Sequence, residues 1–364
     1  MTDSIAQRLL DWYDEHAADL PWRANKDPYR IWLSEIMLQQ TQIDTVIPYY
    51  TRFLDAYPTV AALAHASLDE VLKKWEGLGY YSRARNLHRA AQQVADELDG
   101  QFPATAAELQ SLPGIGPYTA GAVASIAYDE SVPVLDGNVI RVLTRLEGIR
   151  DDVTLNTTRS DLWALAAEWV PQQRAGDYNQ ALMELGQTIC KPRNPECTRC
   201  PLNDRCLAFA NGEQEHYPVK KKKAPTPHFD VAAGIIYNDQ QQILIAQRPL
   251  DGLLGGLWEF PGGKQEADET LPQTLSRELR EELAIEVRVG ELFVQVKHAF
   301  THFRITLHAY ECQYLGPMPP YDVPQLLGAN AFAWVTRDQF AKYSFGKADR
   351  MVIEALNRRK NMLL

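Results

Sequence analysis

The 364-residue sequence has no run approaching the roughly 20 consecutive apolar residues that a membrane-spanning helix needs. Its first residues mix charged and apolar side chains, unlike a secretion signal. No internal repeat is visible. With 45% hydrophobic and 23% charged residues, the composition also excludes a disordered or fibrous chain. We expect a soluble, cytoplasmic monomer with no membrane partner.

Positive charge is also scarce, with 37 Lys and Arg against 47 Asp and Glu and a formal net charge of -10. Proteins that bind nucleic acids usually carry a basic surface, and the deficit here is spread along the chain. Any surface for DNA must therefore be local. Backbone amides and a few well-placed cations could form it.

The length favours two domains, and the residue pattern changes where they would meet. Up to about residue 211 apolar residues recur at helical spacing, whereas Val231–Tyr237 and Ile243–Ala246 are typical of buried strands and 294–310 of a hairpin. The segment between them has four consecutive lysines and three prolines, which indicates an extended linker that could also touch phosphates. We predict an all-α domain (1–212), a linker (213–228) and an α+β domain (229–364).

Cysteine is rare, and four of the 5 cysteines lie close together between residues 190 and 206. Only one pair has the short spacing of a zinc knuckle, so a Cys₄ iron–sulfur cluster of the [4Fe-4S] type fits better than zinc or unligated thiols. The isolated Cys312 is expected in the core. The predicted ligands are Cys190, Cys197, Cys200 and Cys206.

The segment Leu112-Pro-Gly-Ile-Gly-Pro-Tyr-Thr-Ala120 lies between two helical patterns and predicts a helix-hairpin-helix. Gly114 and Gly116 would let the backbone turn tightly and approach a ligand. Free amides at the start of the second helix can hold a phosphate without a basic side chain. This answers the shortage of positive charge, although a plain turn would show the same glycines.

Two carboxyl groups are candidates for acid and electrostatic catalysis. Glu35 lies on a largely apolar helix face, where desolvation would raise its pKa and let it serve as a general acid. Asp136 lies at the expected start of a helix, whose N-terminus favours a carboxylate. Glycosidic-bond cleavage commonly uses one group of each kind. A solvated Glu and a purely structural N-cap Asp remain the alternatives.

Residues 1–212 resemble the helix-hairpin-helix DNA glycosylases with an iron–sulfur cluster, and specifically adenine glycosylases of the MutY family. The resemblance is carried by the order of the four cysteines and by five short motifs, one of which is the hairpin. These motifs are Leu20-Pro-Trp-Arg23, Leu33-Ser-Glu-Ile-Met-Leu-Gln-Gln-Thr-Gln42, Gly77-Leu-Gly-Tyr-Tyr81, Leu112-Pro-Gly-Ile-Gly116 and Leu135-Asp-Gly-Asn-Val139.

The resemblance implies base excision repair of double-stranded DNA in which adenine lies opposite 8-oxoguanine or guanine. Glu35 would protonate the flipped adenine and Asp136 would stabilise the sugar cation. Tyr118 stands where strand-cutting relatives carry the lysine that forms a Schiff base, so strong lyase activity at the abasic site is not expected. The supporting residues implied are Asn138 and Tyr118 for positioning, Gln42 and Tyr80 as wedges in the base stack, and Arg23 and Gln180 on the adenine.

The α+β part contains Gly263-x5-Glu269-x7-Arg277-Glu-Leu-Arg-Glu-Glu-Leu-Ala-Ile285, a nearly complete Nudix box with Ala284 where glycine is usual. In the MutY family a Nudix-like domain recognises the 8-oxoguanine strand. Its glutamates are either a scaffold or Mg²⁺ ligands for nucleotide hydrolysis. The candidate Mg²⁺ ligands are Glu278, Glu281 and Glu282, and the segment Phe300, Thr301 and His302 resembles the lesion-reading loop of the family.

Three functions follow as hypotheses. The leading one is adenine excision. A Mg²⁺-dependent nucleotide pyrophosphatase tethered to DNA would instead use the Nudix box, and a non-catalytic lesion sensor would lack one of the two catalytic carboxyl groups. Both Glu35 and Asp136 are present, which favours the enzyme.

Overall fold

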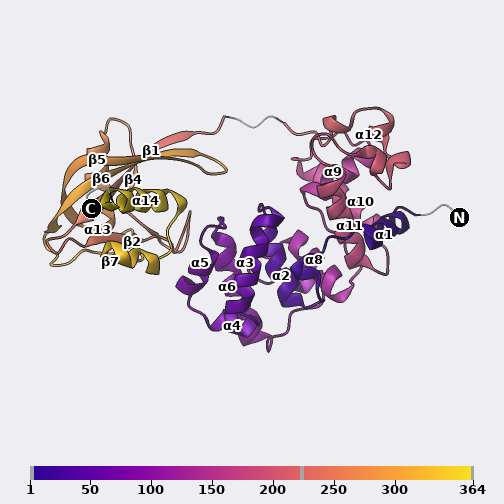
Figure 1. Ribbon diagram of the computed structural model, residues 1–364, viewed down its shortest axis with the longest axis horizontal. Helices are drawn as coiled ribbons and strands as arrows, with labels where there is room; N and C mark the ends of the chain where they lie inside the picture. The colour runs from indigo at the N-terminus through magenta and orange to yellow at the C-terminus, as the bar shows by residue number, and fades with distance from the viewer. Residues whose placement is uncertain (1–3, 222–224, 362–364) are drawn as a thin grey trace. The chain divides into compact units, whose positions relative to one another are not determined.

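The computed structural model describes residues 4–221 and 225–361. The chain divides into two compact units. The first comprises Met1–His65 and Asn86–Lys223, and the second comprises Ala66–Arg85 and Ala224–Leu364. The first unit is helical, whereas the second combines a sheet with helices (Figure 1). Residues 66–85, a segment of the helical part of the sequence, therefore belong to the unit that contains the sheet.

The helices of the first unit begin at residues that favour helix starts. Ser4, Asp27 and Asp136 each accept a hydrogen bond from a backbone amide in the first turn of the helix that follows. The helices up to residue 210, of which α5 and the start of α6 belong to the second unit, are α1 (Ile5–His16), α2 (Pro28–Leu38), α3 (Ile43–Ala56), α4 (Val60–His65), α5 (Leu68–Trp75), α6 (Ser82–Glu97), α7 (Ala106–Leu109), α8 (Pro117–Tyr128), α9 (Gly137–Leu146), α10 (Asn156–Trp169), α11 (Ala175–Thr188) and α12 (Leu207–Ala210).

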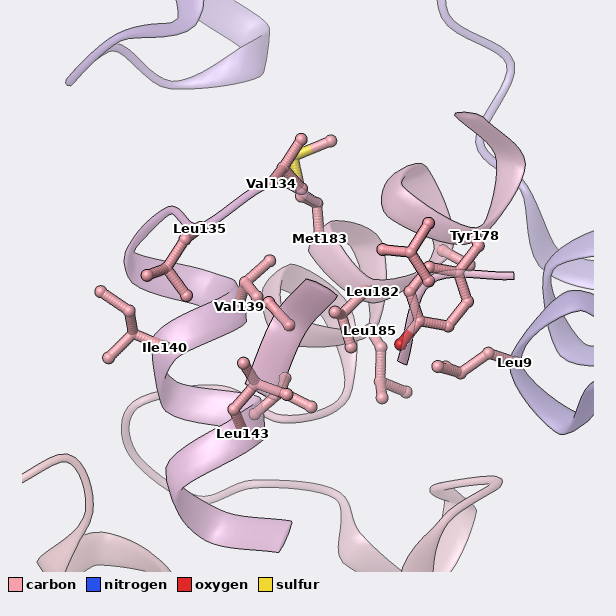
Figure 2. Packing of buried hydrophobic residues seen from close by; sticks show 14 of the residues in the cluster. Leu9, Val134, Leu135, Val139, Ile140, Leu143, Tyr178, Leu182, Met183 and Leu185 are labelled. Atoms are coloured by element: carbon pink, nitrogen blue, oxygen red, sulfur yellow. The ribbon is translucent and has the colours of Figure 1, made fainter. Parts of the chain in front are cut away.

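One core of the first unit is built from α1, α9 and α11. Figure 2 shows Leu9 of α1, Leu143 of α9 and Leu182 of α11 gathered in one buried cluster. On each of these helices the apolar residues recur every three to four positions, which places them on one face of the helix, as the sequence predicts. This packing fixes the start of α9, where Asp136 lies.

Two glycines of α11 let it pack closely on its neighbours. A Cβ atom at Gly176 would come within 2.5 Å of the carbonyl oxygen of Ser125 in α8. A Cβ atom at Gly186 would come within 2.6 Å of the Cβ atom of Asn138 in α9. Both separations are too short for any real side chain, so these two contacts require glycine.

The second unit contains a mixed seven-stranded sheet in the order β3-β2-β1-β6-β5, with β4 paired to β1 and β7 to β2. Strands β1 and β6 are parallel, and the other pairs are antiparallel. The predicted hairpin is longer than expected from the sequence. The strands are β1 (His228–Tyr237), β2 (Ile243–Gln247), β3 (Trp258–Glu259), β4 (Gly262–Lys264), β5 (Ile285–Ala299), β6 (Arg304–Pro317) and β7 (Ala331–Val335).

Alternating side chains of β1 divide the second unit into two apolar clusters. Ala233 and Ile235 contribute to the cluster that includes Leu356 of α14 (Lys347–Asn361). Ile236 contributes to the other cluster, with residues of α13 (Leu271–Leu283). A strand presents successive side chains to opposite faces, so the two helices cover different faces of the sheet.

Part of the predicted linker packs against the helical unit. Tyr217 is buried, and the carbonyl of Val219 accepts a hydrogen bond from the amide of Val153. Residues 222–224 of that linker lie outside the described residues. Within 4–221 and 225–361, none of the helices combines the length and the apolar character that a bilayer span requires.

Candidate active site

A cavity of about 900 Å³ opens in the helical unit between segments distant in sequence. Its volume lies within the range of ligand pockets. Eight residues expected from the sequence to act on DNA line it, whereas Gly114 does not. These are Arg23, Glu35, Gln42, Gly116, Tyr118, Asp136, Asn138 and Gln180.

The hairpin leads directly into this cavity. Gly114 adopts a φ of 76°, in the left-handed region that favours glycine, and thereby turns the chain toward α8. Gly116 is the N-cap of α8 and provides no side-chain cap, while Pro117 occupies the first turn. The first turn of α8 therefore offers backbone amides to an external anion such as a phosphate.

Glu35 is buried in the cavity wall, with 6% of its surface exposed. The Tyr118 hydroxyl donates a hydrogen bond of 2.8 Å to its Oε2. Burial raises the pKa of Glu35 to about 7; the negative charge of Asp136 adds to the rise, while the Tyr118 hydrogen bond and Arg23 oppose it. Glu35 can therefore hold a proton near neutral pH, as a general acid must.

Asp136 caps the N-terminus of α9. Its Oδ1 accepts from the amides of Asn138 at 2.8 Å and Val139 at 2.7 Å, and its Oδ2 accepts from the Asn138 side chain at 2.7 Å. The sequence predicts that the helix terminus would favour the ionised form. Burial nevertheless raises the pKa of Asp136 above its ordinary value, and these hydrogen bonds only partly offset it.

Arg141 connects this end of α9 to the cysteine loop. Its Nη2 donates to Oδ1 of Asn138 at 2.9 Å, and its Nε donates to the carbonyl of Cys190 at 2.7 Å. Sequence reasoning missed this residue. The spacing of three residues between Asn138 and Arg141 on one helix could have indicated the first contact. The contact with residue 190 is tertiary, so no local pattern indicates it.

A second missed residue is Glu184, which orients Arg23. Arg23 donates to Oε2 of Glu184 at 2.6 Å and to Oε1 of Gln180 at 3.0 Å. Gln180 and Glu184 are four residues apart on α11 and therefore share a face. This network holds the guanidinium of Arg23 at the cavity wall.

The four cysteines of the 190–206 loop line one small pocket together with Arg145. Arg145 is 1% exposed, and its guanidinium donates to Sγ of Cys190 at 3.2 Å. Among the described residues, no group of three or more His, Cys, Asp or Glu side chains is placed to hold a metal ion. Four thiols around one pocket fit a cluster of several iron atoms, with the cationic Arg145 beside it.

The other predicted DNA-contacting residues lie in the second unit, around a separate hollow of about 420 Å³. Tyr80, Phe300, Thr301 and His302 all line it. The hydroxyls of Tyr80 and Thr301 are 2.9 Å apart and hydrogen-bonded. Of the two predicted wedges, Gln42 lines the active-site cavity and Tyr80 lines this hollow.

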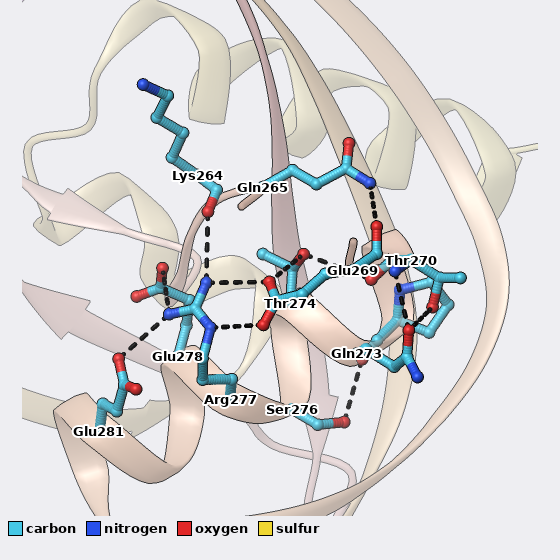
Figure 3. Close-up of polar contacts among 11 residues, drawn as sticks. Lys264, Gln265, Glu269, Thr270, Gln273, Thr274, Ser276, Arg277, Glu278 and Glu281 are labelled. Carbon is cyan, nitrogen blue, oxygen red and sulfur yellow. Dashed lines mark hydrogen bonds and ion pairs between the residues drawn. The ribbon is translucent and has the colours of Figure 1, made fainter. Parts of the chain in front are cut away.

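Arg277 of the Nudix helix α13 is surrounded by Glu269, which precedes the helix, and by Glu278 and Glu281 on the helix (Figure 3). Arg277 donates to Glu269 at 2.7 Å, to Glu278 at 3.0 Å and to Glu281 at 3.1 Å. Burial, together with the charge of Glu278, raises the pKa of Glu282 to about 7. Arg277 therefore compensates much of the negative charge that a Mg²⁺ ion would otherwise neutralise.

Three segments of the chain match known protein families. Residues 33–168 match the HhH-GPD superfamily of base excision DNA repair proteins, residues 190–206 match the iron–sulfur binding domain of endonuclease III, and residues 232–355 match the NUDIX domain. Among solved structures, a thermostable thymine-DNA glycosylase is 30% identical, with a TM-score of 0.52, over 57% of this chain and 95% of that chain.

Complete relatives are also similar over most of their length. The adenine DNA glycosylase of Homo sapiens is 38% identical over 392 residues, covering 91% of this chain and 70% of the human protein. The adenine DNA glycosylase of Mus musculus is 38% identical over 407 residues, covering 96% of this chain and 77% of the mouse protein. Fold and site together define a base excision DNA glycosylase that carries an iron–sulfur cluster and a Nudix-like domain, and binds DNA. The chain belongs to the adenine DNA glycosylase family, the MutY family.

Proposed function

We propose that this enzyme excises adenine mispaired with 8-oxoguanine or guanine, as a step of base excision repair. The adenine glycosylase relatives support the choice of adenine. The observation that carries the chemistry is the pair of carboxyl groups, Glu35 and Asp136, in the wall of one cavity of about 900 Å³.

The two groups share the work of breaking the N-glycosidic bond. Glu35 donates its proton to N7 of the flipped adenine, and the electron pair of the C1′–N9 bond leaves with the base. Asp136 stabilises the positive charge left on the sugar, and water then attacks C1′ and passes its proton to the Glu35 carboxylate that the first step left ionised. We assign the proton to Glu35 because Asp136 accepts three N–H hydrogen bonds that favour its charged form.

The remaining cavity residues position these groups and the base. Asn138 holds Asp136, and Tyr118 holds Glu35. Arg23 and Gln180 contact the extruded adenine, and Gln42 at the cavity rim enters the space that the base leaves. Flipping costs a few kcal/mol of unstacking, which such an insertion offsets in part.

The enzyme is monofunctional and leaves an abasic site. Strand cleavage through a Schiff base needs an amine nucleophile, and the phenol of Tyr118 cannot form one. Tyr118, at the position where an amine would be needed, lines the cavity beside Glu35.

The base opposite the adenine is read in the second unit. Tyr80, Phe300, Thr301 and His302 line one hollow, and the Thr301 hydroxyl supplies the hydrogen-bonding group expected for 8-oxoguanine. We assign the sequence division 1–212, 213–228 and 229–364 to the catalytic part, the linker and this reading part, with residues 66–85 of the first segment contributing to the reading part. The enzyme acts as a cytoplasmic monomer.

The cluster is of the [4Fe-4S] type, held by Cys190, Cys197, Cys200 and Cys206. The Nudix helix is a scaffold, and its ion pairs with Arg277 support this choice over a Mg²⁺-dependent pyrophosphatase using Glu278, Glu281 and Glu282. A Mg²⁺-dependent release of phosphate from free nucleotides by the wild type would overturn the scaffold assignment.

The decisive measurement is the release of free adenine from a duplex with adenine opposite 8-oxoguanine. Wild type should release it, and Glu35→Gln and Asp136→Asn should each be slower by about 10²–10⁴-fold in single turnover, the usual contribution of such a group. Glu147→Gln, on an exposed carboxylate at the other end of α9, serves as the control. Unchanged rates in both catalytic variants would overturn the mechanism, and no release by wild type would overturn the function.

A further inference from the structure

The hollow around Tyr80 and Thr301 is unusual in its charge. Its lining includes three cations and two histidines but no aspartate or glutamate among the residues that the structure describes. The chain as a whole carries a net charge of -10, so a lining without acids is not its general character. The cations are Arg85, Lys347 and Arg350, and the histidines are His298 and His302.

Two of these cations have no counter-ion of their own. Within residues 4–221 and 225–361, neither Lys347 nor Arg350 forms an ion pair with a carboxylate. Nε of Arg350 is buried and has no hydrogen-bond partner in that part of the chain. Arg350 as a whole is only partly buried and lines the hollow, so its guanidinium can pair with an anionic oxygen there.

The positive potential also acts on a neighbour. Burial lowers the pKa of His298, and the charge of Lys347 lowers it further. Lys347 is the first residue of α14, a helix of 15 residues, so the positive end of the helix lies beside it. Arg85, by contrast, donates to the carbonyls of Gly252 and Gly255 and is used to hold that loop.

The rest of the lining suits a nucleobase. The rings of Phe300 and Phe303 are stacked with centroids 4.6 Å apart, and Tyr80 is 43% exposed. Aromatic rings next to unpaired cations are the combination that binds a base and its phosphate. The hollow therefore has the chemistry of a nucleotide site.

We propose that Lys347 and Arg350 form a phosphate site for the DNA strand opposite the excised adenine. It anchors the backbone of the nucleotide whose base is read by Tyr80 and Thr301. This inference rests on the proposed function and assigns two residues to it. Lys347 and Arg350 contact the backbone and not the base, so they set affinity and leave the choice of base unchanged.

The test uses the full-length protein with its cluster and a duplex carrying 8-oxoguanine or guanine opposite a stable abasic-site analogue. Affinity is measured for Lys347→Ala and Arg350→Ala over a series of salt concentrations. Each variant should bind about tenfold more weakly, and the slope of log affinity against log salt should fall by about 1. The ratio of the two affinities should stay as in wild type.

Arg358→Ala is the matched control, because Arg358 lies on the same helix, is exposed and pairs with Glu354. It should behave as wild type. Thermal unfolding and cluster absorbance verify that each variant is folded. Affinities and salt slopes equal to those of wild type in Lys347→Ala and Arg350→Ala would overturn the phosphate site, and so would a changed ratio between the two duplexes.

A second experiment measures the binding of free 8-oxo-deoxyguanosine monophosphate to wild type and to Lys347→Ala. Micromolar binding that is lost in Lys347→Ala would assign the hollow to a free nucleotide and overturn the DNA assignment. Failure of the proposed function is distinguishable, because wild type would then release no adenine while the salt slopes remained measurable. The two hypotheses therefore fail in different experiments.

Discussion

Glu35 and Asp136 present two carboxyl groups to one cavity, and their like charges make double ionisation costly. The pair therefore retains a proton more readily than either group alone. Asp136 accepts three N–H hydrogen bonds, while Glu35 has the neutral Tyr118 hydroxyl. Because Asp136 accepts more hydrogen bonds than Glu35, Asp136 is the group that ionises and Glu35 is the group that keeps the proton.

The rate of base release should fall as the pH rises above about 7, because Glu35 must be protonated and its pKa is about 7. The hydrogen bond from Tyr118 lowers that pKa. Tyr118→Phe should therefore shift the falling limb of the single-turnover pH profile to higher pH. A limb at an unchanged position in Tyr118→Phe would show that another group controls it.

Glu35 also links pH to folding. Its pKa in the folded chain is raised from 4.5 to about 7, so its stabilising contribution is fully present below pH 4.5 and is lost as the pH rises to about 7. Replacing it by the uncharged Glu35→Gln should raise the free energy of unfolding at about pH 8 by up to about 3 kcal/mol. Denaturant unfolding at about pH 5 and about pH 8 checks this, and a gain that does not grow with pH would contradict it.

How far the sequence predicts the site depends on whether a residue acts through its own element. The burial of Glu35 follows from its apolar helical neighbours, and the capping role of Asp136 follows from its position before a helix. Glu184 and Arg141 act through partners more than 40 positions away, such as Arg23 and Cys190. No local pattern encodes such pairs, so the sequence alone could not place them.

Helix α9 joins the catalytic Asp136 at its N-terminus to the cysteine loop near its C-terminus. Arg145 is buried there and donates to Sγ of Cys190 and to the carbonyls of Lys191 and Gln214. Its charge faces the pocket of the cluster and not a carboxylate. The helix thus places one cationic side chain beside the cluster.

Arg145→Gln should lose iron, because it removes a buried positive charge from the cluster pocket and leaves several carbonyls without donors, each costing about 1–3 kcal/mol. Iron content and absorbance at the cluster band measure the loss. Arg199→Gln is the control, since Arg199 belongs to the same loop but is exposed and pairs with Glu196. Equal iron content in the two variants would contradict the role of Arg145.

The contact between α11 and α9 offers a second test. In Gly186→Ala the new methyl group would press on Asn138, which holds Asp136. In Gly176→Ala an equally close contact falls on the backbone of Ser125 instead. Both should be destabilised by about 1–3 kcal/mol, but only Gly186→Ala should lose up to about 10²-fold in single-turnover rate beyond that. Equal rates in the two variants, after correction for folding, would contradict the coupling.

The strands are easier to predict from the sequence than the pairing between them. The strands around Ile235 and Ile245 and the hairpin follow from apolar patterns, but the parallel pairing of β1 with β6 joins residues 76 positions apart, such as His228 and Arg304. Ala284 shows the same limit. It adopts a φ of 49° at the end of α13, where the Nudix pattern expects glycine, so the helix end keeps its left-handed geometry despite the substitution.

The chain as a whole reconciles DNA binding with its net charge of -10 by placing its contacts locally. In the proposed function, the free amides at the start of α8 contact DNA in the helical unit, and Lys347 and Arg350 contact it in the hollow of the second unit. The grouping of residues 66–85 with the sheet unit brings Tyr80 to Thr301, which domain boundaries drawn along the sequence do not show.

Catalysis and reading of the opposite base should therefore be separable by mutation. Thr301→Val keeps the shape of the side chain but removes the hydroxyl that bonds Tyr80 and is available to the lesion. The preference for 8-oxoguanine over guanine should fall by about tenfold, the worth of one lost hydrogen bond, while the excision rate opposite guanine stays unchanged. Thr301→Ser, which retains the hydroxyl, should preserve the preference. A drop opposite both bases alike would place Thr301 in general DNA binding and would remove it from lesion reading.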